Sequence, residues 1–323
     1  MPGPLLQIAH LRIAFDTRRG NLVAVDDVSF DVHRGEVFGI VGESGAGKSL
    51  TGQAVIGLLE PPGRITAGRI RLEGRRIDNL PYARMRRLRG KQIGMIFQDP
   101  LTSLNPLYTI GRQLTETILT HRNMSHAQAR EHAVRILSDV GIPAAEKRME
   151  HYPHQFSGGM RQRVVIALAL CVNPKLVIAD EPTTALDVSI QAQIIALLKQ
   201  LCEKHATAVV LITHDMGVIA EICDRVAVMY AGRIVELGTV RQVVKHARHP
   251  YASGLMGAIP SLRHRQERLN QIEGSMPRLA EIPAGCAFHP RCPEAFAKCR
   301  RRRPHLIEIQ GAQVACWLYG EKA

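Results

Sequence analysis

One short stretch, GESGAGKS at residues 42–49, constrains this chain more than any other. It follows the apolar run EVFGIV (36–41), which has the length of a buried strand, and it precedes an apolar segment that reads as a helix. The pattern GxxxxGK(S/T) between a strand and a helix predicts a loop whose backbone N–H groups curl around phosphate oxygens. The sequence therefore predicts an α/β fold with a P-loop phosphate site.

Strands and helices alternate along most of the chain. Residues 1–35 alternate apolar and polar side chains, which is typical of antiparallel strands. Further on, KLVIAD (175–180), AVVLITH (208–214) and RVAVMYAGRIVELG (225–238) read as strands separated by helices. This alternation predicts a largely parallel sheet that is covered on both faces. A domain boundary is expected near residues 240–260, where Pro and Gly enter.

Composition excludes some classes of protein. With 323 residues, of which 46% are hydrophobic, the chain can fill the cores of two domains. No apolar run approaches 18 residues, so no transmembrane helix is expected. The N-terminus lacks the pattern of a secretory signal, which predicts a protein of a reducing compartment without a disulfide framework.

The net charge of +13 is concentrated in two stretches. Residues 64–91 hold ten Lys or Arg against two acids, and residues 261–323 hold eleven against six. Such patches suit nucleic acid or anionic lipid headgroups, and the alternative is a solvated basic surface. Few aromatic residues lie among the basic ones, which argues against single-stranded nucleic acid as a partner.

Two adjacent carboxylates end the apolar strand LVIADE (176–181). Ligands bind at the carboxyl ends of strands in sheets of this kind. We expect Asp180 to hold Mg²⁺, directly or through water, and Glu181 to act as the general base that polarises the attacking water.

A further Gly-rich stretch, FSGGMRQR (156–163), opens an apolar helix and makes a second anion-binding helix N-terminus. One nucleotide cannot easily use both helix ends within one monomer. With this stretch the sequence resembles ABC-type ATPases, and specifically the ATP-binding subunits of oligopeptide and dipeptide importers. The resemblance covers nearly the whole chain through IFQDPLTSLNP (96–106), YPHQFSGGMRQR (152–163), IADEPTTALDV (178–188), LITHD (211–215), HPY (249–251) and the cysteine-containing tail.

The resemblance implies roles for individual residues. Gln98 matches the Q-loop glutamine that senses Mg²⁺ and water, and His214 matches the switch histidine that contacts the γ-phosphate. Phe15 is the best match to the aromatic residue that stacks on adenine, with a core position as the alternative. Met160 departs from the usual Gln, and we expect activity to survive it. The resemblance also implies that ATP is bound by the loop residues Gly42, Glu43, Ser44, Gly45, Ala46, Gly47, Lys48, Ser49 and Leu50. It implies that Mg²⁺ is bound by Ser49, Gln98 and Asp180. The nucleotide held by the opposite subunit would be contacted by Ser157, Gly158, Gly159 and Asp187.

The same resemblance implies an ABC cassette over residues 1–245, with an antiparallel β subdomain and a helical subdomain near 98–165, and a small cysteine-containing domain over 246–323. It implies two transmembrane permease subunits, a second and related cassette in a heterodimer, and an extracytoplasmic solute-binding protein. The chain would then lie peripherally on the cytoplasmic face of the bacterial inner membrane and drive peptide uptake. The alternatives are import of nickel or another small solute, and a soluble ABC ATPase acting on ribosomes or DNA.

Four cysteines gather near the C-terminus with the spacing C-x5-C-x6-C-x16-C. They are Cys286, Cys292, Cys299 and Cys316. Four thiolates can bind zinc tetrahedrally or hold a 4Fe–4S cluster, and unliganded thiols are the third alternative. The resembled family includes members with such a cluster, and the adjacent arginines 300–303 favour thiolates. The sequence therefore predicts a 4Fe–4S cluster, with zinc as the alternative.

Overall fold

The computed structural model of this chain describes residues 3–18, 20–184, 186–257 and 272–320. It contains two compact units. The first runs through residue 32, resumes at 37–79 and continues from 212 onward, and the second contains residues 33–36 and 80–211. No helix among the described residues is long and apolar enough to cross a membrane.

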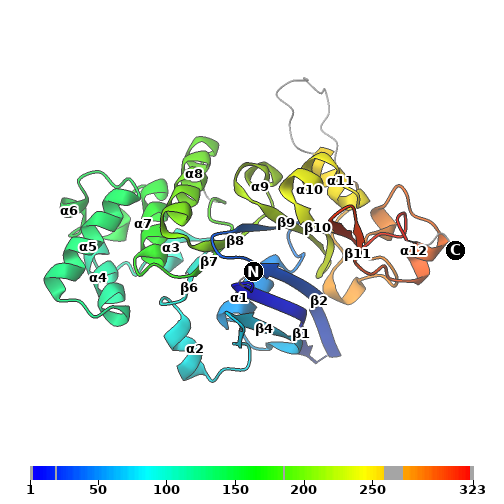
Figure 1. Cartoon of the computed structure of the whole chain (residues 1–323), viewed down its shortest axis with the longest axis horizontal. Coiled ribbons are helices and arrows are strands. Elements are labelled where there is room, and N and C mark those ends of the chain that lie inside the picture. The colour runs from blue at the N-terminus through cyan, green and yellow to red at the C-terminus, as the bar shows by residue number, and fades with distance from the viewer. Residues whose placement is uncertain (1–2, 19, 185, 258–271, 321–323) are drawn as a thin grey trace. The chain divides into compact units, whose positions relative to one another are not determined.

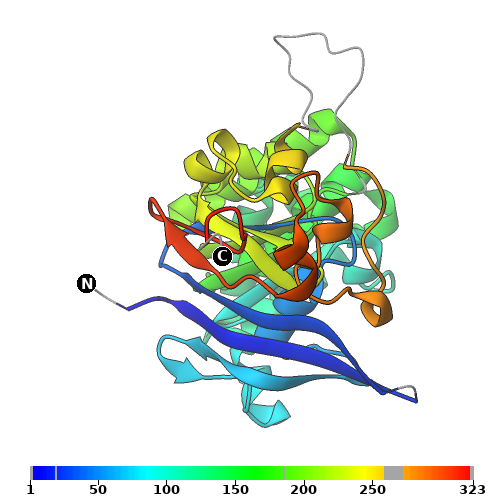
Figure 2. The same cartoon turned by 90° about the vertical axis from the view of Figure 1, so that its right-hand side faces the viewer.

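The first unit contains a four-stranded antiparallel sheet in the order β2-β1-β4-β5. Figure 2 shows its long strands β1 and β2 lying side by side in blue. Leu6 and Ile8 are buried, and after a register shift so are Leu11 and Ile13, because a strand presents every second residue to the core. The antiparallel strands expected over residues 1–35 are present. The elements of this sheet are β1 (Leu6–Thr17), β2 (Gly20–Val32), β4 (Gly63–Leu72) and β5 (Arg75–Arg76).

A second group of strands in the first unit has the order β11-β12-β10-β9-β3. Strand β3 is parallel to β9 and all five of its residues are buried, as expected of a strand covered on both faces. The short tail strand β12 lies beside β10 (Figure 2). Within this pair of strands, Glu236 lies opposite Val314. The tail therefore extends the sheet that carries the loop 42–49. The predicted division near residue 245 stays a prediction.

The segment 225–238 differs from the single strand that the sequence predicts. It forms a hairpin of β9 and β10, with Tyr230 paired to Arg233 across the turn. Both turn residues have positive φ, 45° at Ala231 and 80° at Gly232, which is the requirement of a type I′ turn. A Cβ on Gly232 would lie 2.4 Å from the Ala24 carbonyl oxygen, so only glycine fits there. The remaining elements of the first unit are β3 (Val37–Val41), α1 (Lys48–Ile56), α9 (Met216–Ile222), β9 (Arg225–Tyr230), β10 (Arg233–Thr239), α10 (Val240–Lys245), α11 (Pro250–Gly257), η2 (Leu279–Glu281), η3 (His289–Arg291), α12 (Ala297–Arg301), β11 (Ile307–Ile309) and β12 (Ala312–Val314).

The second unit combines parallel strands with a group of helices (Figure 1). Strands β6 and β7 are parallel, and β8 lies next to β7. Helix α5 begins with a capping box in which Ser125 and Gln128 satisfy each other's backbone N–H groups. The elements of the second unit are α2 (Tyr82–Leu88), β6 (Ile93–Ile96), α3 (Pro100–Ser103), α4 (Ile110–His121), α5 (His126–Asp139), α6 (Ala145–Arg148), η1 (Pro153–Gln155), α7 (Gly158–Leu170), β7 (Leu176–Asp180), α8 (Val188–His205) and most of β8 (Ala208–Thr213). The last two residues of β8 belong to the first unit.

Candidate nucleotide site

The loop between β3 and α1 has the backbone of a phosphate-binding loop. Gly42, Gly45 and Gly47 have φ values of 156°, 83° and 96°, a region that side-chain-bearing residues rarely adopt. A Cβ on Gly42 would also lie 2.2 Å from the Met229 carbonyl oxygen. The loop therefore follows a tight path that glycine alone permits, and it ends at the positive N-terminus of α1.

Lys48 is the first residue of α1, and its side chain points back into the loop. Its Nζ donates to the carbonyl oxygens of Gly42, at 2.8 Å, and Glu43, at 3.0 Å. The residue is only 5% exposed, so these bonds compensate the burial of a charge. Ala46 is buried, whereas Ser44 and Gly45 are exposed and Ser49 and Leu50 are half-buried. The loop thus surrounds a single fixed positive charge, which is the arrangement that a phosphate group requires.

Glu43 is held by two side chains from far along the chain. Its backbone N–H donates to the Tyr251 hydroxyl at 2.9 Å. Its carboxylate accepts two hydrogen bonds from the Arg291 guanidinium, at 3.0 and 3.1 Å. Sequence reasoning missed Arg291, and no local pattern marks it, because 248 residues separate it from Glu43. The tail therefore contacts the phosphate-binding loop directly.

Two further predicted residues lie in the first unit. His214 directly follows β8 and is exposed, and the next residue, Asp215, caps α9 by accepting the N–H of Gly217 at 2.7 Å. Phe15 lies in β1 opposite Gly63 and is half-buried. A Cβ on Gly63 would lie 2.9 Å from Phe15 Cε1, so the Phe15 ring packs over this glycine. The rest of the Phe15 side chain stays partly exposed. Both proposed roles, γ-phosphate contact and adenine stacking, stay predictions.

The second unit brings the side chains of Gln98, Glu181 and Thr184 together at the end of β7. Asp180 is buried at the end of the strand, and Glu181 follows with a strained φ of 46°. The Glu181 Oε2 atom accepts a hydrogen bond from Gln98 Nε2 at 3.3 Å and another from the Thr184 hydroxyl at 2.7 Å. Sequence reasoning named Gln98 and Glu181 but missed Thr184. These two bonds orient the carboxylate that is the candidate general base.

The stretch FSGGMRQR opens α7 as the sequence predicts. The Ser157 hydroxyl caps the helix by accepting the Met160 N–H, and Ser157 and Gly158 are exposed. A Cβ on Gly159 would lie 2.9 Å from Ile190 Cγ2, so glycine is required where α7 packs on α8. Asp187, the residue before α8, is exposed. This helix end is thus open to a ligand, and its part in binding ATP stays a prediction.

The four tail cysteines do not form the predicted metal site. They line one small cavity of about 10 Å³, which is hardly the size of a water molecule. Burial raises the pKa of the Cys286 thiol to about 11 and also raises the pKa values of Cys292 and Cys316, so these groups carry their protons. Among the described residues, no three His, Cys, Asp or Glu side chains are placed to hold one metal ion. The prediction of a 4Fe–4S cluster, or of zinc, on Cys286, Cys292, Cys299 and Cys316 is therefore wrong.

Comparison with known proteins identifies the family. Residues 25–184 match the family "ABC transporter", and residues 235–299 match "Oligopeptide/dipeptide transporter, C-terminal region". The chain is 52% identical to "Oligopeptide transport ATP-binding protein OppD" of Escherichia coli (strain K12), over 97% of this chain and 93% of that protein. It is 48% identical to "Dipeptide transport ATP-binding protein DppD" of Bacillus subtilis (strain 168), over 99% and 96% of the two chains. This chain belongs to the family of ATP-binding proteins of oligopeptide and dipeptide ABC transporters.

The fold of this ABC protein matches that of a solved ABC cassette. A solved structure entitled "Dimeric Structure of MJ0796, a Bacterial ABC Transporter Cassette" matches with a TM-score of 0.65 and 28% identity, over 73% of this chain and 99% of that one. The predicted ABC cassette fold and the predicted ABC-type ATPase class are confirmed. A separate cysteine-containing C-terminal domain is not confirmed.

Proposed function

We propose that this chain is the ATP-hydrolysing subunit of a bacterial ABC importer of dipeptides and oligopeptides. The observation that carries this proposal is the identity of about half of all residues with the oligopeptide and dipeptide transport proteins, over both the ATPase region and the tail. The names of these relatives refer to peptides, which favours peptide over nickel as the solute. The family of the tail likewise favours a transporter over an ATPase of ribosomes or DNA.

The proposed reaction is hydrolysis of ATP by water. The loop 42–49 would hold the phosphates, with Lys48 as their fixed positive charge. Glu181, oriented by Gln98 and Thr184, would take the proton of the attacking water. The oxygen donors of Ser49, Asp180 and Gln98 suit Mg²⁺, which when bound would neutralise charge on the β- and γ-phosphates.

A second cassette would complete the site. The exposed helix end at Ser157 and Gly158 would contact the γ-phosphate held by the partner, with Asp187 next to it at the interface. We propose a related but different chain as this partner. Closure of the two cassettes around ATP would then supply the mechanical step of transport.

The permease would dock on the second unit. Around Gln98, the side chains of Phe97, Leu101 and Leu107 are 42%, 61% and 79% exposed. Such exposed apolar side chains are suited to a protein partner. We propose two permease subunits as that partner, with a solute-binding protein outside the membrane. This assembly would place the chain peripherally on the cytoplasmic face of the bacterial inner membrane.

The substitution Glu181→Gln tests the chemical step. It keeps the size of the side chain and removes the base, so ATP hydrolysis is expected to fall by about 10²–10⁴ while ATP still binds. The ATP-bound pair of cassettes should then accumulate, as measured by size-exclusion chromatography. Glu203→Gln, on the exposed surface of α8, is the matched control. Hydrolysis at the rate of the unsubstituted protein would remove Glu181 from its proposed role.

Transport is tested on the assembled complex. Co-purification with both permease subunits and the second cassette should give an ATPase that peptides stimulate through the solute-binding protein. Stimulation by nickel and not by peptides would refute the proposed solute.

A further inference from the structure

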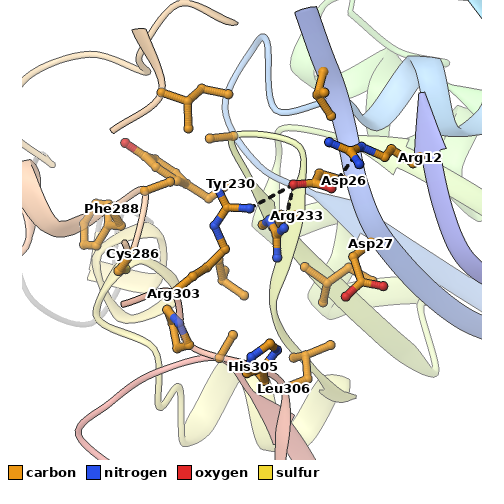
Figure 3. A pocket seen from close by; sticks show the side chains of 18 of the residues that line it. Arg12, Asp26, Asp27, Tyr230, Arg233, Cys286, Phe288, Arg303, His305 and Leu306 are labelled. Carbon is orange, nitrogen blue, oxygen red and sulfur yellow. Dashed lines mark hydrogen bonds and ion pairs between the residues drawn. The ribbon is translucent and has the colours of Figure 1, made fainter. Parts of the chain in front are cut away.

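A cavity of about 650 Å³ lies in the first unit, apart from the loop 42–49. Figure 3 shows its side chains coming from β1, β2, the β9–β10 hairpin and the tail. Pockets that bind small organic molecules have volumes in this range. Much of its wall is apolar, formed by Val23, Ile234, Val235, Leu279, Ile282 and Phe288.

Three arginines converge on one carboxylate at the edge of this cavity (Figure 3). Arg303 and Arg233 donate to Asp26 Oδ2, the first at 2.9 Å, and Arg12 Nε lies 3.5 Å from Asp26 Oδ1. Burial of Asp26 acts to raise its pKa, but the hydrogen bond and charge of Arg233 and the charges of Arg12 and Arg303 outweigh it and lower the pKa. Asp26 is therefore ionised at neutral pH.

The cluster of Asp26 with Arg12, Arg233 and Arg303 keeps an excess charge of +2. Two carboxylate oxygens cannot saturate three guanidinium groups, each of which has five N–H donors. The arginine side chains are 24–49% exposed, and all three line the cavity. One arginine would be enough to bind the tail to the sheet through Asp26. The two further arginines beside an apolar cavity indicate a ligand with an anionic group.

We propose that this cavity binds a small organic molecule with one carboxylate and an apolar body. The carboxylate would lie at Arg12, Arg233 and Arg303, because the planar guanidinium matches a carboxylate in bidentate geometry. The body would lie against Val235, Phe288 and their apolar neighbours. Asp26 and Asp27 both line the cavity and repel a doubly charged group more strongly than a singly charged one, which favours a carboxylate over a phosphate monoester.

Two sources supply this chemistry: the C-terminus of a short apolar peptide and a medium-chain fatty acid. Both present a single carboxylate on an apolar chain. The experiment below uses one probe from each source.

The cavity shares a wall with the residues that hold Glu43. Phe288 and Tyr230 line the cavity, and their ring centroids are 5.2 Å apart. Phe288 also contacts Tyr251, at 5.3 Å between centroids, and the Arg291 guanidinium carbon lies 5.9 Å from its ring centroid. Arg291 and Tyr251 are the two side chains that bind Glu43 in the phosphate-binding loop. A ligand that packs against Phe288 and shifts its ring is therefore expected to change ATP affinity, and ATP is expected to change the ligand's affinity by the same factor.

Calorimetric titration of the full chain, without nucleotide, tests the site. The probes are trileucine with an acetylated N-terminus (called trileucine below) and octanoate, each compared with its neutral amide, and inorganic phosphate. At least one acid is expected to bind more tightly than its amide by about 10-fold or more, since the amide lacks the charge that the arginines bind. Binding of trileucine alone identifies the peptide source, and binding of octanoate alone the fatty acid. Equal binding of acids and amides, no binding of either acid at millimolar concentration, or binding of phosphate alone would overturn the proposal.

Two variants locate the binding. Arg303→Gln removes one guanidinium and is expected to weaken binding of the acid by about 10-fold or more, whereas Arg301→Gln, exposed on α12, is the matched control and should leave it unchanged. Ala287→Phe, in the half-buried wall, places a ring in the cavity while keeping all the charges, and should weaken binding by about 10-fold or more. Unchanged binding in both test variants would place the probe elsewhere and refute the site. If Arg303→Gln fails to fold, judged by thermal unfolding, Ala287→Phe decides alone.

The expected effect on ATP affinity rests on the proposed function, whereas binding of the acid does not. The titration uses no nucleotide, so its outcome is independent of hydrolysis by Glu181. ATP affinity is then measured with and without the bound acid.

Discussion

The contact between Arg291 and Glu43 should stabilise the phosphate-binding loop measurably. The Arg291 side chain is 8% exposed, and besides Glu43 it donates to the carbonyl oxygens of residues 272, 273 and 274. Removing one partner of a buried ion pair costs about 3–5 kcal/mol. Glu43 is 28% exposed and regains water, so we expect Arg291→Gln to lower the free energy of unfolding by about 2–4 kcal/mol.

A double-mutant cycle separates the pair from the other bonds of Arg291. Unfolding in urea is measured for Arg291→Gln, Glu43→Gln and the double variant, with Arg278→Gln in the exposed part of the tail as control. We expect a coupling free energy of about 1–2 kcal/mol between Arg291 and Glu43, because two charge-assisted hydrogen bonds join them in a partly screened site.

The same variants should bind ATP more weakly. The Glu43 carbonyl oxygen accepts a hydrogen bond from Lys48, so a loosened Glu43 also releases the charge that we propose for phosphate binding. A coupling free energy below about 0.5 kcal/mol together with unchanged ATP affinity would refute this reasoning, because that is the scatter expected of independent sites.

Three further predictions follow from single features. Burial lowers the pKa of His249 from 6.5 to about 3. Between pH 6.5 and pH 3 only the unfolded chain therefore binds a proton at this residue, so lowering the pH favours unfolding. The free energy of unfolding should fall by about 1.4 kcal/mol per pH unit more steeply than in His249→Asn, as measured by urea unfolding across this range. Gly159→Ala brings a Cβ to 2.9 Å from Ile190 Cγ2 and should cost about 1–3 kcal/mol, and adding Ile190→Ala should restore part of the helix packing; equal melting temperatures for Gly159→Ala and the unsubstituted protein would contradict this. Incubation with an iron or zinc chelator should leave the melting temperature unchanged, because the tail cysteines form no metal site. A fall in melting temperature on chelation would show that these cysteines do hold a metal.

Local signals in the sequence predicted the parts of the fold that local interactions determine. The run EVFGIV, the loop GESGAGKS and the following helix are contiguous, and each is specified by its own residues. The hairpin of β9 and β10 was missed for the opposite reason. Its apolar residues continue up to the turn, and only the dipeptide Ala231–Gly232, followed by the single polar residue Arg233, marks the reversal. A turn made of one alanine and one glycine leaves almost no trace in a hydrophobic pattern.

Contacts between distant residues were beyond sequence reasoning. The spacing of the four cysteines gave the number of possible ligands, but the space between them depends on how the tail packs. Arg291 likewise has a role only because the fold brings it to Glu43. Thr184 was quoted within a family motif, but its hydrogen bond to Glu181 depends on the strained backbone at that residue.

The position of Arg291 in the chain also affects how the protein is made. Glu43 is synthesised 248 residues before its partner, which at about 5–20 residues per second is a delay of roughly 10–50 s. During that time the nascent chain already contains its complete phosphate-binding loop but not the arginine that holds Glu43. The ribosome must therefore finish almost the whole protein before this loop reaches its final structure, and a chain that stops short of the tail is released with the loop unsupported.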